Sequence, residues 1–328
     1  MSAPIVVLGA GAFGTALANL AARNGARVIL WARDAGHVED MRRTRENARR
    51  LPGVKLAGSI EPSADIARVG EAGVILAAAP AQALRDVARA AAPFARDGAD
   101  WLICAKGVER GTHAFLSDVV AAEIPTAVAS VLSGPSFAED IAAGLPTAIT
   151  LAAPDAARAE RLGRLLDSPT FRLYRSTDVR GAEIGGAAKN VLAIACGIAA
   201  GRRLGASAVA ALTARGFAEL SRFGRAFDAR PETLMGLSGL GDLVLTCSSL
   251  QSRNFAFGHA LGRGVSLADA AGGKLAEGAF TARALVELAA ERAVEMPISA
   301  VVDAIVSGEM SIDAAIESLL MRPVKSEV

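Results

Sequence analysis

The sequence predicts a doubly wound α/β domain followed by an all-α C-terminal domain. In the first half of the chain, short apolar runs alternate with segments of helical spacing, which is typical of a parallel sheet covered on both faces. A glycine-rich turn directly follows the first of these runs, and strand-like runs stop after about residue 178. The chain has 328 residues, about twice the usual length of one domain. We therefore expect two domains, at residues 1–180 and 181–328.

The elements of the first half follow one another in a regular order. The first predicted strand, residues 5–8, is β-branched and leads into a predicted helix at residues 12–24, which Gly25 caps. The next strand is expected at residues 27–32. Further buried strands are expected at residues 74–78, 101–105, 128–132, 147–151 and 171–174, and helices at residues 81–92 and 112–122.

The second half of the chain is predicted to be helical. Helix-length segments lie at residues 183–200, 207–223, 252–261, 280–292 and 300–306. No internal repeat or low-complexity linker separates the halves, so the junction is short and a fixed cleft between the domains is expected. Clefts at domain interfaces are a common place for a ligand.

The composition argues against a nucleic-acid partner. The 35 basic and 34 acidic residues leave a net charge of +1, whereas nucleic-acid binders usually carry a strong basic excess. The basic cluster at residues 42–50 is interleaved with acids and is typical of a solvated helix face. With 52% hydrophobic but only 4% aromatic residues, the chain can bury a large core by close backbone packing.

The cysteines, the histidines and the N-terminus favour a soluble, cytoplasmic protein without stable membrane insertion. The cysteines are odd in number and far apart, which gives no disulfide framework, and the histidines lack metal-binding spacing, so we expect no metal. The N-terminus lacks the pattern of a signal peptide, and apolar stretches such as residues 191–201 end well short of a membrane span. The residues concerned are Cys104, Cys196, Cys247, His37, His113 and His259.

The glycine-rich turn at residues 9–14 predicts a dinucleotide-binding loop of the Rossmann type. It directly follows a predicted strand and opens a helix, which separates a fingerprint from a chance GxGxxG or a merely flexible turn. Gly9 permits the tight turn, Gly11 lets the backbone approach the pyrophosphate, and Gly14 lets helix and strand pack closely. The amides of the helix N-terminus then face the diphosphate.

The end of the second predicted strand bears on the choice between NADPH and NADH. NAD-selective sites often place an acid there to bind the ribose 2′-hydroxyl. Here Arg33 occupies the position and Asp34 lies one step late. Arg33 fits a 2′-phosphate or stacking over adenine, so the sequence modestly favours NADPH; the alternative is a plain solvated arginine.

A lysine in the first long helix of the second half is a candidate proton donor. The apolar residues of the predicted helix at 183–200 form a stripe, and Lys189 stands off it among small residues that a ligand or a neighbouring backbone can approach. A partly buried lysine has a lowered pKa and can exchange a proton. A lysine that extends to solvent is equally compatible with the spacing.

Two further segments contain candidate site residues. A glycine-rich turn at residues 236–241 ends in Asp242, which either caps a helix or lies beside a lysine and tunes its charge. Ser252, Arg253 and Asn254 precede an apolar segment at a predicted helix start. Hydroxyl, guanidinium, amide and free backbone N–H groups suit a phosphate, although such a tripeptide is usually just a cap.

Together these segments resemble the bacterial-type NAD(P)-dependent glycerol-3-phosphate dehydrogenases. The matching segments occur in the family's order and extend over nearly the whole chain. GAGxxG is shared by many dehydrogenases, but the others in this order are far more specific. Alanine at 12 and serine at 207 replace a serine and an asparagine common in the family. The segments are GAGAFGTALA from residue 9, CAKGVE from 104, SGPSFAEDIAAGLPTA from 133, GGAAKNVLAIACG from 185, GLGDLVLTCSS from 239, QSRN from 251 and AEG from 276.

The resemblance implies a reversible reduction of dihydroxyacetone phosphate by NAD(P)H to sn-glycerol 3-phosphate, which supplies glycerophospholipid synthesis. It also implies a homodimer. Lys189 would be the proton donor or acceptor at the C2 oxygen, with Lys106 touching substrate and cofactor and Asp242 beside them. Matching substrate-binding positions are Lys106, Gly134, Ser136, Lys189, Asp242, Ser252, Arg253 and Asn254, and matching cofactor-binding positions are Gly9, Gly11, Ala12, Phe13, Gly14, Arg33, Lys106, Ala138, Arg253, Leu275 and Glu277.

Two alternatives remain open from the sequence. A related β-hydroxyacid dehydrogenase also has a dinucleotide domain, a helical domain and a lysine followed by asparagine, but the segment at residues 252–254 favours a phosphorylated substrate. A catalytically silent NADPH-binding sensor is a third possibility, against which the joint presence of Lys106, Lys189 and Asp242 argues.

Overall fold

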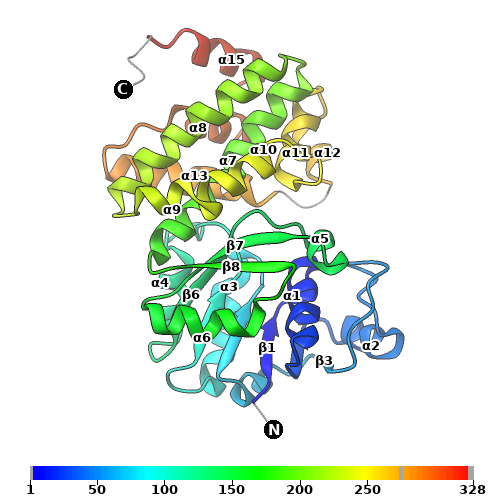
Figure 1. The fold of residues 1–328 in the computed structure, drawn as a ribbon. Coiled ribbons are helices and arrows are strands. Elements are labelled where there is room, and N and C mark those ends of the chain that lie inside the picture. The colour runs from blue at the N-terminus through cyan, green and yellow to red at the C-terminus, as the bar shows by residue number, and fades with distance from the viewer. Residues whose placement is uncertain (1–2, 273–275, 324–328) are drawn as a thin grey trace.

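The chain folds into a sheet part and a helical part stacked end to end, with the two termini at opposite ends of the molecule (Figure 1). The computed structural model describes residues 3–272 and 276–323. The predicted order of an α/β sheet followed by helices is confirmed.

A single eight-stranded sheet forms the first part. Its strand order is β3-β2-β1-β4-β5-β6-β7-β8, so the order reverses beside β1, where ligands bind in open sheets of this kind. Strand β3 was not predicted from the sequence; it contains a proline and lies at an edge of the sheet, which is the position a proline tolerates. The strands are β1 Ile5–Leu8, β2 Val28–Trp31, β3 Ile60–Ser63, β4 Val74–Ala77, β5 Asp100–Ile103, β6 Val128–Ser133, β7 Thr147–Ala152 and β8 Phe171–Ser176.

The expectation of a fully parallel sheet is wrong at one strand pair. β7 runs antiparallel to β6, while β8 is parallel to β7. The connection after β6 holds only the short helix α5 (Ala138–Ala143), which packs against α1 (Ala12–Arg23). Because this connection stays at one end of the sheet instead of crossing back over a face, the chain re-enters the sheet in the opposite direction.

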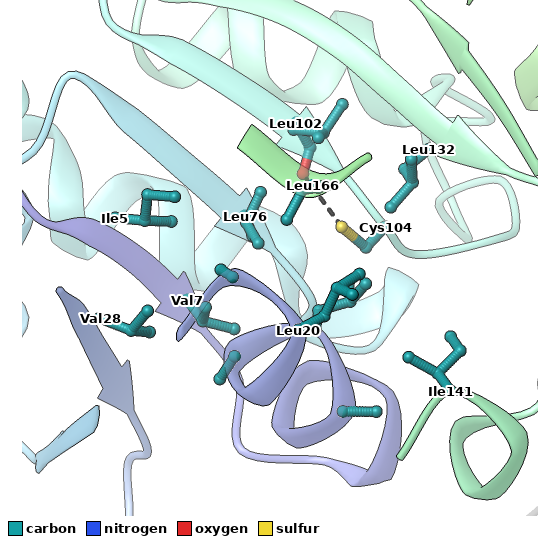
Figure 2. Packing of buried hydrophobic residues seen from close by; sticks show 14 of the residues in the cluster. Ile5, Val7, Leu20, Val28, Leu76, Leu102, Cys104, Leu132, Ile141 and Leu166 are labelled. Carbon is teal, nitrogen blue, oxygen red and sulfur yellow. Dashed lines mark hydrogen bonds between the residues drawn. The ribbon is translucent and has the colours of Figure 1, made fainter. Parts of the chain in front are cut away.

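Helices cover both faces of the sheet, and the core lies between them. Figure 2 shows Val7 and Leu76 of neighbouring strands beside Leu20 of α1, all of them buried. This packing fixes α1, and so its first turn, against the end of β1. The remaining helical elements of this part are α2 Ala35–Thr44, η1 Ile66–Glu71, η2 Ala81–Ala83, α3 Leu84–Ala91, η3 Ala92–Phe94, α4 Leu116–Glu123 and α6 Ala156–Leu166.

The second part is built around helix α7 (Val179–Gly201). The apolar stripe predicted for α7 lies in the core, and nearly every other residue from Gly181 to Ala199 is buried as well. The neighbouring helices enclose it on all sides because its many glycines and alanines let them approach. The other elements are α8 Ala206–Ala226, α9 Pro231–Met235, η4 Leu237–Gly241, α10 Asp242–Cys247, α11 Arg253–Gly262, α12 Leu267–Ala271, α13 Glu277–Glu291, α14 Pro297–Val306 and α15 Ile312–Leu320.

Helix α7 is also long and apolar enough to cross a bilayer, which the sequence reading did not anticipate. However, 83% of an apolar stretch of 18 residues in this helix is buried inside the protein. The buried core helix of a soluble protein can have the same length and composition.

Contacts at the start of α7 join the two parts. Asp178 caps the helix by accepting from the N–H of Gly181, and its other oxygen accepts from the N–H of Arg230 at 2.8 Å. One turn later, the Glu183 carboxylate accepts from the N–H and the hydroxyl of Ser117 at the start of α4, both at 2.7 Å. Burial raises the pKa of Glu183 to about 7. These bonds hold α7 in a defined position against the sheet.

Candidate active site

The glycine loop lies at the carboxyl end of β1, where its three glycines have different surroundings. Gly9 has φ of +122°, and a Cβ there would lie 2.7 Å from the backbone N of Ala79. A Cβ on Gly14 would overlap the carbonyl oxygen of Gly9, so only glycine lets α1 approach the strand. A Cβ on Gly11 would meet nothing within 4 Å, which leaves open space at the helix N-terminus.

The first turn of α1 offers backbone N–H groups to a ligand. Its N-cap is Gly11, which makes no side-chain cap hydrogen bond, and Ala12 and Phe13 are partly exposed. The first N–H groups of a helix lack intrahelical acceptors and favour an anion. An uncapped helix start next to open space therefore fits the diphosphate of a dinucleotide.

At the end of β2, Arg33 and Asp34 differ in their partners. Asp34 is the N-cap of α2: its carboxylate accepts from the N–H of His37 at 3.0 Å and pairs with Arg49 at 3.1 Å. Arg33 is exposed, and no hydrogen bond or ion pair engages its side chain within the described ranges. Asp34 is thus already engaged in capping, whereas Arg33 has no partner in the part of the chain that the structure describes.

Lys189 is held inside the protein rather than extended to solvent. Its side chain is only 9% exposed, and its Nζ donates to the carboxylate of Asp242 and to the hydroxyl of Thr246, the latter at 2.9 Å. The small residues on its face allow this. A Cβ on Gly185 would overlap the carbonyl oxygen of Ser238, which lies within the glycine-rich turn that leads to Asp242.

Lys106 reaches the same carboxylate from the sheet. It follows β5, and its Nζ donates to Asp242 Oδ2 at 2.6 Å and to the carbonyl oxygen of Gly134 at 2.9 Å. Gly134 has φ of +153°, and a Cβ there would lie 2.8 Å from Ile149, so the turn after β6 requires glycine. Asp242 opens α10 with a side chain 1% exposed; it receives both lysines and does not cap the helix with its side chain.

Two ammonium groups on one buried carboxylate leave an excess of positive charge. Burial lowers the pKa of Lys189 to about 8; the charge of Lys106 lowers it as well, whereas Asp242 opposes the shift. Lys189 is therefore mostly charged at pH 7 but loses its proton far more readily than an ordinary lysine, which suits a group that donates and accepts a proton.

The segment at residues 252–254 lies at the start of α11, as predicted. Its three side chains have different surroundings. The Ser252 hydroxyl caps the helix by accepting from the N–H of Phe255 at 3.3 Å. The Asn254 amide donates to Asn190 at 3.0 Å and accepts from the N–H of Gly278 at 2.9 Å, which links α7, α11 and α13. Arg253 is exposed at the helix start.

The other predicted positions lie at the beginnings of helices or turns. The Ser136 hydroxyl donates to the carbonyl oxygen of Gly134 at 3.1 Å. Ala138 is the first residue of α5 and is buried, and Glu277 is the first residue of α13 and is partly buried. Leu275 lies outside the described residues.

Sequence reasoning missed three residues of this cluster. Thr246 bonds Lys189 and donates to the backbone oxygen of Asp242 at 2.6 Å; its place four residues after Asp242 puts both on one helix face. Asn190 follows Lys189 directly and binds Asn254. Ser133 is buried with a hydroxyl that has no partner among the described residues, near the Lys106 side chain. Thr246 had a signal in its spacing from Asp242, and Asn190 had one in its place directly after Lys189.

A groove of about 860 Å³ elsewhere between the two parts involves none of these residues. It is lined by residues of β8, α6 and α9, including Tyr174, Arg230 and Thr233. The chemistry of the lysine pair therefore does not belong to this groove.

Comparisons with known proteins agree over both parts of the chain. A family model described as the NAD-dependent glycerol-3-phosphate dehydrogenase N-terminus matches residues 4–159, and one described as its C-terminus matches residues 178–317. The chain is similar to enzymes named glycerol-3-phosphate dehydrogenase (NAD(P)+) from Azorhizobium caulinodans, at 61% identity, and from a Bradyrhizobium species, at 60%, each over 98% of both chains. The crystal structure of glycerol-3-phosphate dehydrogenase from Coxiella burnetii matches with a TM-score of 0.93 at 39% identity, covering 97% of this chain and 99% of that one.

Proposed function

The chain belongs to the NAD-dependent glycerol-3-phosphate dehydrogenase family, and we propose that it reversibly reduces dihydroxyacetone phosphate to sn-glycerol 3-phosphate with NAD(P)H. The observation that carries this proposal is the pair of lysines, Lys106 and Lys189, on the single buried carboxylate of Asp242. Lys106 and the glycine loop both follow parallel strands at their carboxyl ends, so the charged cluster and the dinucleotide loop are at the same edge of the sheet.

The cofactor would be held by the glycine loop and supported by residues around it. When bound, the reduced nicotinamide supplies a hydride. The open space at Gly11 and the uncapped start of α1 fit its diphosphate. The proposed cofactor contacts are Gly9, Gly11, Ala12, Phe13, Gly14, Arg33, Lys106, Ala138, Arg253, Leu275 and Glu277.

The lysines would act on the oxygen of the ketone. Negative charge develops on that oxygen as the carbonyl carbon is reduced, and a positioned ammonium group stabilises it. Lys189 then donates its proton, and in the reverse direction neutral Lys189 accepts one. Lys106 adds positive charge from the sheet side, and Asp242 orients both ammonium groups. Reduction needs protonated Lys189, so its rate should fall as pH rises through the lowered pKa of about 8.

The substrate phosphate would bind at the start of α11. Arg253 supplies an exposed cation there, and the helix start supplies N–H groups, while Ser252 and Asn254 keep the turn and its neighbours in place. Gly134 and Ser136 would border the substrate on the sheet side. Binding energy from the phosphate, which does not react, can then position the ketone.

Several finer points belong to the same proposal. Arg33, which is exposed and has no partner among the described residues, and Asp34, which caps α2, support a modest preference for NADPH over NADH. We place the domain boundary near residue 180, between the end of β8 at Ser176 and the first turn of α7. The protein would act as a cytoplasmic homodimer that supplies phospholipid synthesis, with no nucleic-acid partner and no stable membrane insertion.

The first test is the loss of reduced-nicotinamide absorbance with dihydroxyacetone phosphate, run in parallel with NADPH and NADH. Rapid oxidation that requires the phosphate group supports the reaction and the substrate. Comparison of the wild type with Arg33→Ala then tests the arginine, because its loss should lower the preference for NADPH severalfold. No oxidation despite tight NADPH binding would instead favour a hydroxyacid dehydrogenase or a silent sensor.

A further inference from the structure

A fully buried asparagine joins the glycine loop to the loop that follows α2. Asn47 is 0% exposed. Its Nδ2 donates to the carbonyl oxygen of Ala10 at 3.0 Å and to the Thr15 hydroxyl at 2.7 Å. Its Oδ1 contacts Nε2 of the His37 ring at 2.8 Å. One amide thus connects the turn between Gly9 and Gly11, the helix α1 and the helix α2.

The bond to Ala10 bears directly on the orientation of an amide in the glycine loop. The peptide between Ala10 and Gly11 is planar and trans, so its N–H points opposite to its C=O. Asn47 holds that C=O, which fixes the direction of the Gly11 N–H at the uncapped helix start. The glycine at position 11, on one side of this peptide, would otherwise allow the peptide to rotate more easily.

The bond to His37 connects Asn47 to the residues at the end of β2. His37 lies in the first turn of α2, where its N–H is capped by Asp34, the neighbour of Arg33. His37 is 8% exposed and Asn47 is fully buried, so the contact between them is shielded from water. The diphosphate end and the ribose end of the proposed dinucleotide site are therefore joined through one side chain.

We propose that Asn47 is a positioning residue that holds the glycine loop and the ribose end of the site in the orientation that binds NAD(P)H. It acts through the Ala10–Gly11 peptide rather than by touching the reacting atoms. This inference rests on the proposed cofactor site. It assigns a role in cofactor binding to a residue of the loop after α2, which lies outside the glycine loop.

Asn47→Ala tests the proposal in the full-length protein. The dissociation constants of NADPH and NADH, measured by fluorescence titration, should both rise about tenfold, as expected when a buried hydrogen-bonded group is removed. The kcat at saturating cofactor and the KM for dihydroxyacetone phosphate should stay within about twofold of the wild type, because the lysine cluster is untouched.

Asn19→Ala is the matched control. Asn19 is also a buried asparagine, 5% exposed, and it also joins α1 to the loop after α2, by accepting from the N–H of Ala57 at 2.9 Å. Within residues 3–272 and 276–323, its side chain makes no hydrogen bond to the glycine loop. Both variants should lower the melting temperature, but only Asn47→Ala should weaken cofactor binding.

Asn47→Asp keeps the size of the side chain and serves if the alanine variant does not fold. Its carboxylate can still accept from His37 and Thr15, but it repels the carbonyl oxygen of Ala10, so cofactor binding should again weaken. Unchanged binding in both variants, or an equal loss in Asn19→Ala, would overturn the inference. A wild-type protein that binds neither nucleotide would instead overturn the proposed function.

Discussion

The glycine loop and the lysine cluster form the proposed active site in opposite ways. The loop is one contiguous stretch, residues 9–14, and what it offers a ligand is backbone and open space. The cluster consists of side chains, with Lys189 and Asp242 separated by 53 positions and Lys106 and Asp242 by 136. No two of its three charged residues belong to the same helix or strand.

This difference determines what each region is sensitive to. In the loop, an added Cβ changes backbone packing or fills the space for the diphosphate. In the cluster, the backbone is regular helix or turn, and a substitution changes charge on a buried carboxylate. We therefore expect changes in the loop to alter cofactor binding and changes in the cluster to alter the chemical step.

The largest effect is expected from Lys189→Ala. Removing the proton donor and its positive charge should lower kcat by about 10³-fold or more. The dissociation constant of NADPH should remain near that of the wild type, because Lys189 is not one of the proposed cofactor contacts. Steady-state kinetics and a binding titration measure the two quantities. Near-normal turnover would refute the proposed role.

Two glycine substitutions separate the contribution of the loop to folding from its contribution to NADPH binding. Gly14→Ala introduces an overlap with the Gly9 carbonyl, so it should lower the melting temperature and weaken NADPH binding by about a hundredfold. Gly11→Ala has open space around its Cβ and φ of −75°, so it should fold normally and still weaken NADPH binding. Thermal denaturation and titration of both variants distinguish these cases. Normal NADPH binding by Gly11→Ala would place the diphosphate elsewhere.

Arg253→Ala should act mainly on the phosphate. We expect the KM for dihydroxyacetone phosphate to rise about thirtyfold, since a charge-assisted contact is lost, with a smaller fall in kcat. The unphosphorylated ketone, dihydroxyacetone, provides the control because it lacks the group that Arg253 would bind. An equal loss of activity toward both ketones would show that Arg253 does not recognise the phosphate.

The smallest effect is a shift in the pH profile on removal of Lys106. The charge of Lys106 lowers the pKa of Lys189, so Lys106→Met should raise it from its value of about 8. The alkaline limb of the reduction rate, where Lys189 loses its proton, should then move to higher pH even though total activity falls. Rates measured from pH 6 to 10 test this. A limb that stays in place or moves to lower pH would contradict the proposed coupling.

Most of the fold was accessible from the sequence because its signals are local. Apolar runs, helical spacing and the glycine turn predicted most strands and the change to helices near residue 178. The sequence did not predict β3, the antiparallel β7 or the complete enclosure of α7. Each of these depends on where a segment packs, through the short α5 connection or through neighbouring helices, and local residue patterns do not contain that information.

The sequence by itself determined which residue types are present and which backbone conformations are allowed. Gly9 and Gly14 have to be glycine for the turn that they form, and Arg33 follows its strand in any doubly wound fold. Only the tertiary structure decided that Lys106, Lys189 and Asp242 meet, and that Asn47 holds the glycine loop. The physical reason is that backbone geometry is set by neighbours in the chain, whereas burial and charge pairing depend on segments that folding brings together.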